Sequence, residues 1–263
     1  MKKKIFFFDI DETLLRTRIG VPQSAVNAIR KLRENGHLAF INTGRSMGNV
    51  DNIIRDIGFD GYVAGCGSYL EINGKIIKNL LLSDAQLELA RDIFINSFDS
   101  CIIYEGPELL YYDEKYKDMI TERCILYPDI WNMDKFRPYV RNQSFVNKLG
   151  CLFSKDTDKD KMVKMTENDF QIVLSDMGIY CDLMQKGLTK ALGVKEVLDY
   201  YKMDMEDTVA FGDSNNDLEM IETVGLGIAM GNACSSLKNL ADYCTKDLTD
   251  DGIEFALNEY GFI

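Results

Sequence analysis

Two acidic residues follow the first apolar segment of the chain. The run at 5–8, Ile-Phe-Phe-Phe, is typical of a strand buried on both faces of a parallel sheet, and Asp9 and Asp11 come next. Side chains two apart on a strand point to the same side, so we expect this pair to share one small space. Two close carboxylates repel each other, and a divalent cation is the usual way to hold such a pair ionised. The alternative is that both residues merely end the strand and begin a turn.

A second acidic pair follows another apolar segment. The run at 208–212 ends in Asp213, and Asp217 lies one turn into the next predicted helix. Ligands of open α/β sheets bind outside the carboxyl ends of the strands, so we expect these carboxylates and Asp9 to converge on one crevice. Three or more carboxylates without a histidine or cysteine favour a hard cation, here Mg²⁺. The alternative is that Asp213 or Ser214 only caps the helix.

The loop after the second predicted strand suits a phosphate group. The Thr43 hydroxyl, the Gly44 amide and the N-terminus of a helix predicted at 46–57 form a phosphate cradle. Lys190 opens a predicted helix and would supply a compensating cation, with Lys186 as its competitor. An electrophilic metal, a carboxylate, a hydroxyl and a lysine around one phosphate make a site for phosphoryl transfer.

A carboxylate can act as the nucleophile in such a site. Asp9 would attack the phosphorus atom and form an aspartyl phosphate. Asp11 would protonate the leaving oxygen and later activate a water molecule.

Composition excludes several classes of function. The chain has 263 residues and a formal net charge of −12, which argues against sequence-independent binding of nucleic acid. The single histidine, His37, nearly excludes a Ser-His-Asp triad or a zinc site. No window has the apolar length of a membrane span, and we expect no targeting segment. Seven cysteines without a CxxC spacing then favour reduced thiols and a cytoplasmic location.

Strands and helices alternate over most of the chain, which predicts an α/β fold with a parallel sheet covered on both faces. The alternation stops in the middle, where antiparallel strands with intervening helices indicate a separate α+β unit. The stretch 127–147 is aromatic and irregular and is left unassigned. The predicted core strands are 5–8, 37–42, 61–66, 208–213, 226–230 and 242–245, and the predicted core helices are 22–35, 46–57, 190–201 and 215–222.

Four segments resemble the four motifs of the haloacid dehalogenase (HAD) superfamily. They are 9–14 (DIDETL), 42–45 (NTGR), 187–191 (GLTKA) and 212–217 (GDSNND). The tail, from the segment 227–233 to the segment 250–253, resembles the Cof-type subgroup with a type IIB cap. The resemblance implies a Rossmann-like catalytic core at 1–81 plus 185–263, interrupted by an inserted α+β cap at 82–184 that sets substrate specificity.

The resemblance also implies a role for each matching residue. Asp9 is implied as nucleophile and Asp11 as general acid and base, and Lys190 is preferred over Lys186. The implied metal-site residues are Asp9, Asp11 through its carbonyl, Asp213 and, as a support of the site, Asp217. The implied phosphate- or substrate-binding residues are Thr43, Gly44, Arg45, Lys190 and Asn216.

Three residues depart from the family pattern. Glu12 and Ala191 stand where the family usually has glycine, and Cys66 stands where it usually has asparagine. None of the three removes a group with a predicted catalytic role, so we expect the protein to be active.

The sequence thus predicts a Mg²⁺-dependent phosphatase that hydrolyses small phosphorylated metabolites, in particular sugar phosphates, through an aspartyl phosphate. One alternative is a sugar phosphomutase with the same core. Others are a phospho-accepting receiver-like module and an inactive binding protein. The expected partner is the small metabolite, without nucleic acid or membrane, and the oligomeric state is not predicted. The aromatic residues of the insert belong either to its core or to a specificity wall; they are Tyr104, Tyr111, Tyr112 and Trp131.

Overall fold

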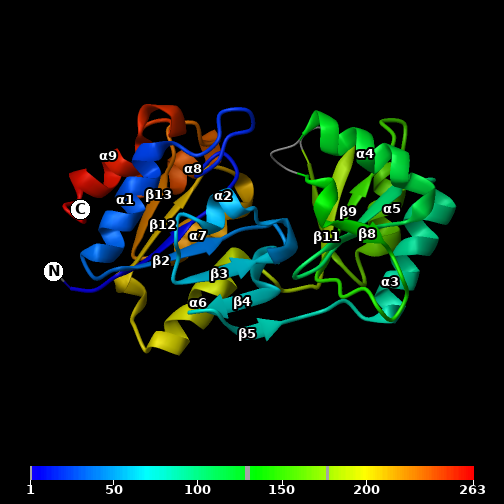
Figure 1. The fold of residues 1–263 in the computed structure, drawn as a ribbon, viewed down its shortest axis with the longest axis horizontal. Helices are drawn as coiled ribbons and strands as arrows, with labels where there is room; N and C mark the ends of the chain where they lie inside the picture. The colour runs from blue at the N-terminus through cyan, green and yellow to red at the C-terminus, as the bar shows by residue number, and fades with distance from the viewer. Residues whose placement is uncertain (1, 128–130, 176–177) are drawn as a thin grey trace. The chain divides into compact units, whose positions relative to one another are not determined.

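The structure is a computed structural model that describes residues 2–127, 131–175 and 178–263. The chain divides into two compact units, and Figure 1 shows the elements of both. The first, which we call the core unit, comprises Met1–Gly44, Val50–Ile77 and Thr189–Ile263. The second, which we call the inserted unit, comprises Arg45–Asn49 and Lys78–Leu188.

The core unit is built on one sheet of eight strands. Its strands are β1 Ile5–Phe8, β2 Leu38–Asn42, β3 Gly61–Ala64, β4 Tyr69–Ile72, β5 Lys75–Asn79, β12 Thr208–Gly212, β13 Leu226–Ala229 and β14 Tyr243–Cys244. Their order is β14-β13-β12-β1-β2-β3-β4-β5, and the pairs from β14 to β3 are parallel. β1 lies in the middle, and all four of its residues are buried, as expected for a strand covered on both faces.

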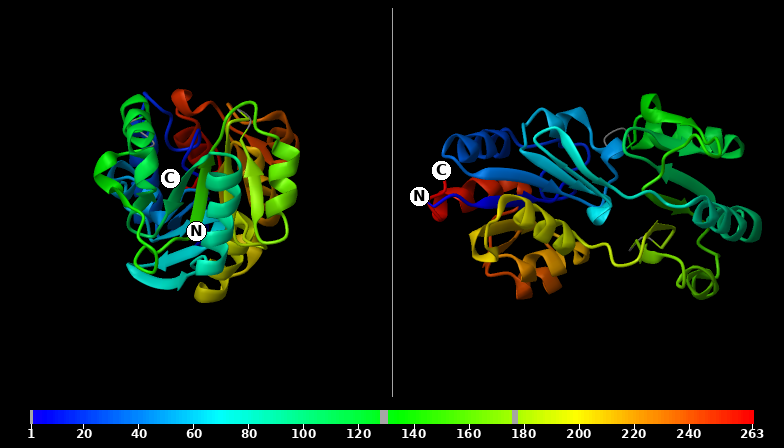
Figure 2. Two further views of the ribbon diagram at one scale, coloured as in Figure 1. Left: turned by 90° about the vertical axis from the view of Figure 1, so that its right-hand side faces the viewer. Right: turned by 90° about the horizontal axis from the view of Figure 1, so that it is seen from below.

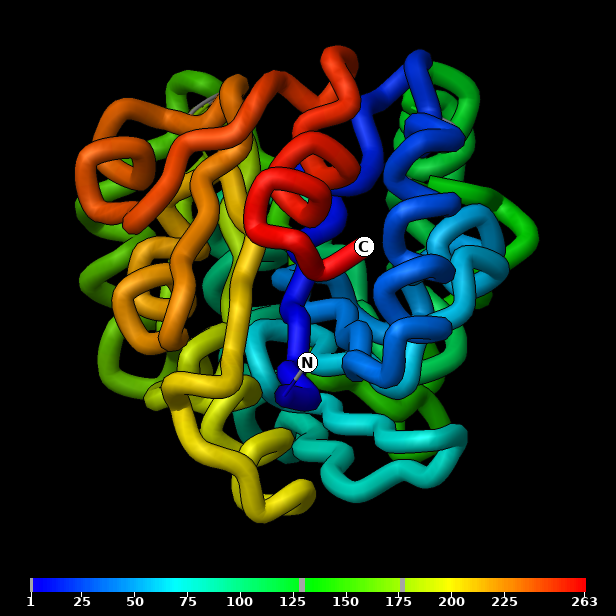
Figure 3. Tube along the Cα trace, turned by 90° about the vertical axis from the view of Figure 1, so that its left-hand side faces the viewer, coloured from blue at the N-terminus to red at the C-terminus, as the bar shows by residue number. Residues whose placement is uncertain are grey.

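Helices cover both faces of this sheet. α1 (Gln23–Glu34) packs against α9 (Gly252–Glu259). On the other face, α6 (Lys190–Tyr201), α7 (Leu218–Thr223) and α8 (Ser235–Leu240) pack in a row. Figures 2 and 3 show the sheet between these two layers. The predicted α/β core is therefore confirmed.

The helix predicted at 46–57 is wrong. In its place the structure has a 3₁₀ turn, η1 (Met47–Asn49), and a single turn of α-helix, α2 (Asn52–Arg55). Ser46 does not cap a helix, and its hydroxyl, although buried, has no hydrogen-bond partner among the residues that the structure describes. The reason is tertiary packing, because Gly48 N–H donates to the Gly106 carbonyl (3.0 Å) within the inserted unit.

The inserted unit contains a mixed six-stranded sheet, as the expected α+β insertion requires. Its strands are β6 Cys101–Glu105, β7 Leu110–Tyr112, β8 Phe136–Pro138, β9 Lys148–Leu152, β10 Gln171–Leu174 and β11 Tyr180–Met184, in the order β10-β11-β9-β6-β7-β8. Its helices are α3 Asp84–Ala90, which continues as the π-helical segment Arg91–Ser97, α4 Lys117–Leu126 and α5 Lys159–Thr166. β8 lies in the stretch that the sequence left unassigned. Residues 128–130 of that stretch, and 176–177 in the turn of the predicted hairpin 170–184, lie outside the described residues.

The aromatic residues of the insert belong to its apolar clusters. Tyr104 and Tyr111 are buried in one cluster, and Tyr112 is buried in a second, against which Trp131 packs. The structure therefore favours the core role for these side chains. No helix among the described residues is long and apolar enough to cross a bilayer.

Candidate active site

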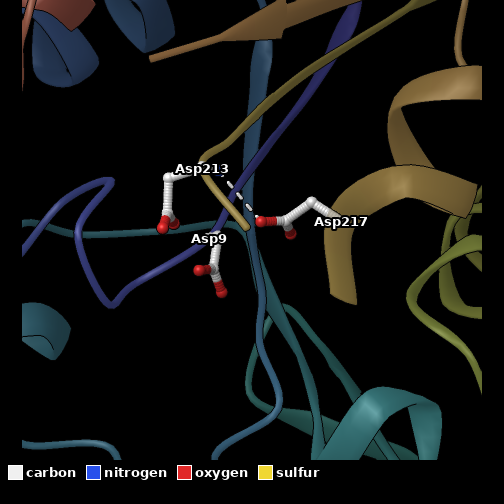
Figure 4. A group of neighbouring side chains, drawn as sticks. All are labelled: Asp9, Asp213 and Asp217. Atoms are coloured by element: carbon white, nitrogen blue, oxygen red, sulfur yellow. Dashed lines mark hydrogen bonds between the residues drawn. The ribbon is translucent and has the colours of Figure 1, made fainter. Parts of the chain in front are cut away.

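Three carboxylates meet at the carboxyl ends of two neighbouring strands. β1 ends directly before Asp9 and β12 directly before Asp213, and Phe8 pairs with Phe211 in the register of these strands. One carboxylate oxygen from each of Asp9, Asp213 and Asp217 lies within 4.8 Å of the other two. Figure 4 shows the three side chains gathered at this point. The structure thus brings together residues that the sequence places 204 positions apart (213 − 9).

Asp217 is held in place by the backbone of the loop that it ends. Its Oδ2 accepts hydrogen bonds from the amides of Asp213 (3.0 Å) and Ser214 (3.1 Å). The side chain is fully buried. Both bonds go to Oδ2, so they orient the carboxylate while Oδ1 faces Lys190.

Lys190 is the cation of this cluster. It is the first residue of α6, and its Nζ lies 2.7 Å from Asp9 Oδ1 and 2.6 Å from Asp217 Oδ1. Its side chain is completely buried, so these ion pairs are shielded from water. The competing lysine, Lys186, is exposed and belongs to the inserted unit.

Burial and mutual repulsion shift the pKa values of the cluster. Burial raises the pKa of Asp9 to about 7, with Lys190 opposing the shift and Asp217 and Asp11 adding to it. Burial, followed by the charges of Asp9 and Asp217, raises the pKa of Asp213 to about 8. Burial alone would lower the pKa of Lys190, but Asp217 and Asp9 outweigh it, so that its pKa lies above its usual value. The single positive charge of Lys190 therefore does not neutralise the negative charge of three carboxylates.

The chemistry of the donor set fits a divalent cation. The cluster offers three carboxylate oxygens, and no histidine or cysteine belongs to it within the described chain. Hard cations such as Mg²⁺ prefer oxygen ligands of this kind. The raised pKa values of Asp9 and Asp213 indicate charge that a cation would neutralise.

Thr43 and Gly44 follow the next strand of the sheet. β2 pairs with β1 and ends at Asn42, so Thr43 leaves the sheet beside Asp9. A Cβ built on Gly44 would lie 3.6 Å from Cys66 Sγ and 3.8 Å from Asn216 Nδ2. Asn216 Oδ1 also accepts a bond from Lys190 Nζ (3.3 Å). Thr43, Gly44, Asn216 and Lys190 are thus neighbours, although no helix begins after Gly44 as the phosphate-cradle argument expected.

Two predicted site residues are not among the three clustered carboxylates. Asp11 is exposed, and its charge adds to the raised pKa of Asp9. β1 ends at Phe8, so Asp9 and Asp11 do not alternate on one strand as expected. Its carbonyl role and its acid–base role stay predictions. Arg45 is buried in the inserted unit, where its Nη1 donates to the Asn49 carbonyl (3.4 Å).

Three further residues support the site and were not predicted for it. Thr13 donates to Asp213 Oδ1 (3.1 Å), and Asn42 donates to the Lys190 carbonyl (2.9 Å). Asn232 donates to the Glu12 carbonyl (2.7 Å). The sequence signal for Thr13 and Asn42 is their place in two segments that resemble the family motifs, 9–14 and 42–45, and it does not reveal their distant partners.

Two of the three departures from the family pattern adopt left-handed backbone. Glu12 has a φ of 59° and Cys66 a φ of 52°. Glycine and asparagine adopt this conformation at the least cost, which explains why they would be the common residues there. Ala191 sits in the first turn of α6, where alanine is favourable.

Comparisons with known proteins find a family and relatives that match along most or all of the chain. Residues 6–257 match the model of a family described as haloacid dehalogenase-like hydrolase. The chain is 30% identical over 269 residues to "Putative phosphatase YkrA" of Bacillus subtilis, covering all of both chains. It is 24% identical to the 5-amino-6-(5-phospho-D-ribitylamino)uracil phosphatase YitU of the same organism, over 98% of each chain.

Solved structures show the same fold. A hypothetical protein of Geobacillus kaustophilus superposes with a TM-score of 0.87 at 25% identity, covering 99% of this chain and 100% of that one. A structure described as the HAD subclass IIB sugar phosphatase BT4131 superposes with a TM-score of 0.83 at 23% identity, with the same coverage. The core sheet and the inserted sheet are therefore a known combination.

Proposed function

Because the chain belongs to the haloacid dehalogenase-like hydrolase family, we propose that it is a Mg²⁺-dependent phosphatase of sugar phosphates that acts through an aspartyl phosphate on Asp9. Its predicted membership in the family is confirmed, and so is its assignment as a phosphatase of small phosphorylated substrates. The Cof-like, subclass IIB type is supported by the fold that the chain shares with structures so described. The substrate class, the identity of the metal and the roles of individual residues are the proposal.

One observation carries the mechanism. Asp9 is 3% exposed, stands at the end of the central strand, and contacts Lys190 within a group of three carboxylates. A carboxylate held beside a fixed cation can approach a phosphate dianion without the full repulsion of two anions. The other two carboxylates of the described cluster are less suited to attack. Asp217 pairs with Lys190 but is fixed by two backbone amides, and Asp213 follows a strand but forms no ion pair with Lys190 in the part of the chain that the structure describes.

The metal would be held by Asp9 and Asp213, with the Asp11 carbonyl as a further ligand. Asp217 would support them by fixing the backbone of Asp213. When bound, a divalent cation polarises the phosphoryl oxygens and neutralises the carboxylates around it.

The remaining residues bind the phosphate and move protons. The Thr43 hydroxyl, the Gly44 amide, Asn216 and Lys190 would donate hydrogen bonds to the phosphoryl oxygens. Asp9 attacks the phosphorus atom and the ester oxygen leaves with a proton from Asp11. Asp11 then takes a proton from the water that attacks the aspartyl phosphate, which releases inorganic phosphate and restores Asp9.

Two relatives support sugar phosphates as the substrate class. BT4131 is described as a sugar phosphatase, and YitU is named for a substrate that carries a phosphorylated ribityl chain. In both cases the phosphate is borne by a polyhydroxylated carbon chain, which is the feature that we propose this protein recognises.

The proposal is tested by hydrolysis of para-nitrophenyl phosphate with Mg²⁺ or with a chelator. We expect activity only with the metal, and we expect Asp9→Asn to lower kcat by roughly 10³-fold or more because the nucleophile is lost. Asp199→Asn is the control, since Asp199 is an exposed residue of α6. Full activity of Asp9→Asn would overturn the mechanism.

A panel of phosphorylated metabolites tests the substrate class. We expect kcat/KM to be highest for sugar phosphates, with release of inorganic phosphate. A preference for phosphates without a polyhydroxylated chain would contradict the proposed class. Conversion of a sugar phosphate into its isomer with little free phosphate would favour the phosphomutase instead.

A further inference from the structure

Glu12 lies in a tight turn, Ile10 to Leu15, that is closed by backbone hydrogen bonds. The amides of Leu14 and Leu15 both donate to the Ile10 carbonyl (2.8 Å each), and the Glu12 amide donates to the Leu15 carbonyl (2.8 Å). Within this turn Glu12 has a left-handed φ of 59°. A glutamate in that conformation is strained, and such strain persists only where the surroundings hold it.

An arginine holds the side chain of Glu12. Arg16 Nε lies 2.6 Å from Glu12 Oε2, and the other end of the same guanidinium lies on Asp247, with Nη1 3.0 Å from Oδ1 and Nη2 3.4 Å from Oδ2. The Arg16 side chain is 22% exposed and that of Asp247 29% exposed. The planar fork of the guanidinium suits such a double contact, and a lysine would not reproduce it.

The backbone of Glu12 is also held by hydrogen bonds to the C-terminal part of the chain. Asn232 Nδ2 donates to the Glu12 carbonyl (2.7 Å), while Asn232 Oδ1 accepts from the amide of Leu248 (3.1 Å). Asp247 and Leu248 are neighbours in sequence. The loop at Asp247 and Leu248 is therefore linked to the Glu12 side chain through Arg16 and to the Glu12 carbonyl through Asn232.

We propose that Arg16 is a positioning residue for the reaction, and that it acts by holding Glu12 against Asp247 so that Asp11 and Thr13 keep their places. This inference rests on the proposed function. Asp11 and Thr13 flank Glu12 directly, and Thr13 donates to Asp213, so a change of φ at Glu12 moves the acid–base residue and loosens the metal site. We call the Glu12, Arg16 and Asp247 side chains the Glu12 clamp.

Kinetic analysis of Arg16→Ala tests the clamp. We expect kcat to fall roughly tenfold while KM stays within about twofold, because a misplaced catalytic group slows the chemical step without weakening phosphate binding. Arg33→Ala is the matched control. It removes a forked ion pair with Asp60 (2.9 and 3.0 Å) elsewhere in the core unit, and it should leave kcat unchanged.

A double mutant separates positioning from general stability. Glycine adopts a positive φ without strain, so Glu12→Gly makes the clamp unnecessary. In the Glu12→Gly background, Arg16→Ala should change kcat by less than about twofold. An equal loss in both backgrounds would overturn the proposal, since Arg16 would then act independently of Glu12.

Hydrogen exchange supplies a readout that does not depend on activity. The amides of Glu12, Leu14 and Leu15 are hydrogen-bonded within the loop. Arg16→Ala should speed their exchange, while Arg33→Ala should not. Unchanged exchange in Arg16→Ala would overturn the clamp even if the enzyme is active. Absence of activity in the wild-type protein, with faster exchange in Arg16→Ala, would overturn the proposed function and leave the clamp supported.

Discussion

Three carboxylates and one ammonium group share the end of the core sheet, so the group carries excess negative charge when all four are ionised. Burial and this excess of negative charge raise the pKa values of Asp9 and Asp213. In the protein without metal, these two carboxyls therefore retain protons at a pH where the unfolded chain has lost them. A bound cation must replace those protons, which links metal affinity to pH.

The first prediction concerns this linkage. Between about pH 4 and pH 8 the metal-free folded state binds more protons than the unfolded state, so its free energy of unfolding falls as the pH rises. Mg²⁺ at about one hundred times its dissociation constant should add about 2.7 kcal/mol of stability. At a fixed Mg²⁺ concentration, the stabilisation should be larger at about pH 8.5 than at about pH 6, because fewer protons must leave at the higher pH.

Thermal unfolding with and without Mg²⁺ at both pH values measures this effect. Asp213→Asn should lose most of the stabilisation by Mg²⁺, and Asp199→Asn should behave like the wild type. A stabilisation by Mg²⁺ that is the same at both pH values would contradict the assignment of the shifted carboxyls to the metal site.

The sequence contains enough information to predict the acidic residues of the site but not their supports. Asp9 and Asp213 follow apolar runs, and parallel strands bring their carboxyl ends together, so their convergence could be predicted. Thr13 donates to Asp213 and Asn42 to the Lys190 carbonyl, contacts that span 200 and 148 residues. No local pattern specifies such pairs, because they depend on how the folded loops meet.

At the scale of elements, the end of β12 has no room for a side chain. A Cβ at Gly212 would lie 2.6 Å from Asp217 Cγ. Gly212→Ala should therefore push Asp217 away from Lys190 and from the amides that hold it. We expect a loss of about 1–3 kcal/mol in the free energy of unfolding, since overpacked cores are strained by such amounts. Displacement of the supporting carboxylate should also lower kcat/KM roughly tenfold or more.

Gly225→Ala is the control for this prediction. Its Cβ would lie 2.7 Å from the Glu206 carbonyl oxygen, near the opposite end of β12. It should lower stability by a similar amount and leave the Mg²⁺ dependence of the activity unchanged. If Gly212→Ala and Gly225→Ala had the same effect on activity, the placement of Asp217 would not matter to the reaction.

Elements governed by local periodicity were predicted well, and those governed by tertiary contacts were not. The amphipathic pattern of 22–35 corresponds to α1, Gln23–Glu34. The segment 46–57 also has an apolar helical pattern, but Arg45–Asn49 packs in the inserted unit. There the Ser46 amide donates a hydrogen bond to Glu105 Oε2 (3.4 Å). Packing of this kind overrides helix propensity, and a sequence window does not contain it.

At the scale of the whole molecule, the inserted unit has a buried ionic group of its own. Lys148 Nζ lies 2.7 Å from Asp182 Oδ1 and 3.8 Å from Glu105 Oε1. The Lys148 and Glu105 side chains are 4% and 3% exposed. Burial raises the pKa of Glu105, and Lys148 opposes that shift. Lys148 is thus the counterion of the buried Glu105 and of the partly exposed Asp182.

Removal of that counterion gives the next prediction. Lys148→Met should lower the free energy of unfolding by about 3–5 kcal/mol at about pH 8, because it leaves the buried Glu105 carboxylate without this counterion. The loss should be smaller at about pH 5, because Glu105, whose pKa rises further without the lysine, then takes up a proton. Denaturant unfolding at both pH values measures it, with the exposed Lys164→Met as control. A loss that grows toward acid pH would contradict this account.

The division into two units was predictable in kind. The change from alternating strands and helices to antiparallel strands marks the insertion, and the alternation predicts that the core sheet is parallel. β8 escaped prediction because Phe136–Pro138 is short and contains a proline, which is unusual except at the edge of a sheet. The substrate class is not encoded in a comparable pattern.

Trapping the phosphorylated enzyme tests the central claim most directly. Asp11→Asn keeps the nucleophile but lacks the base that activates water. With para-nitrophenyl phosphate, whose nitrophenolate leaves without a proton from Asp11, the aspartyl phosphate should therefore accumulate in the presence of Mg²⁺. After an acid quench and digestion, mass spectrometry should find one phosphoryl group on the peptide that contains Asp9, and none when Asp9 is also replaced by Asn. Hydrolysis by the wild-type enzyme without any phosphoryl group on Asp9 in the trapped variant, or with the group on another residue, would contradict the account.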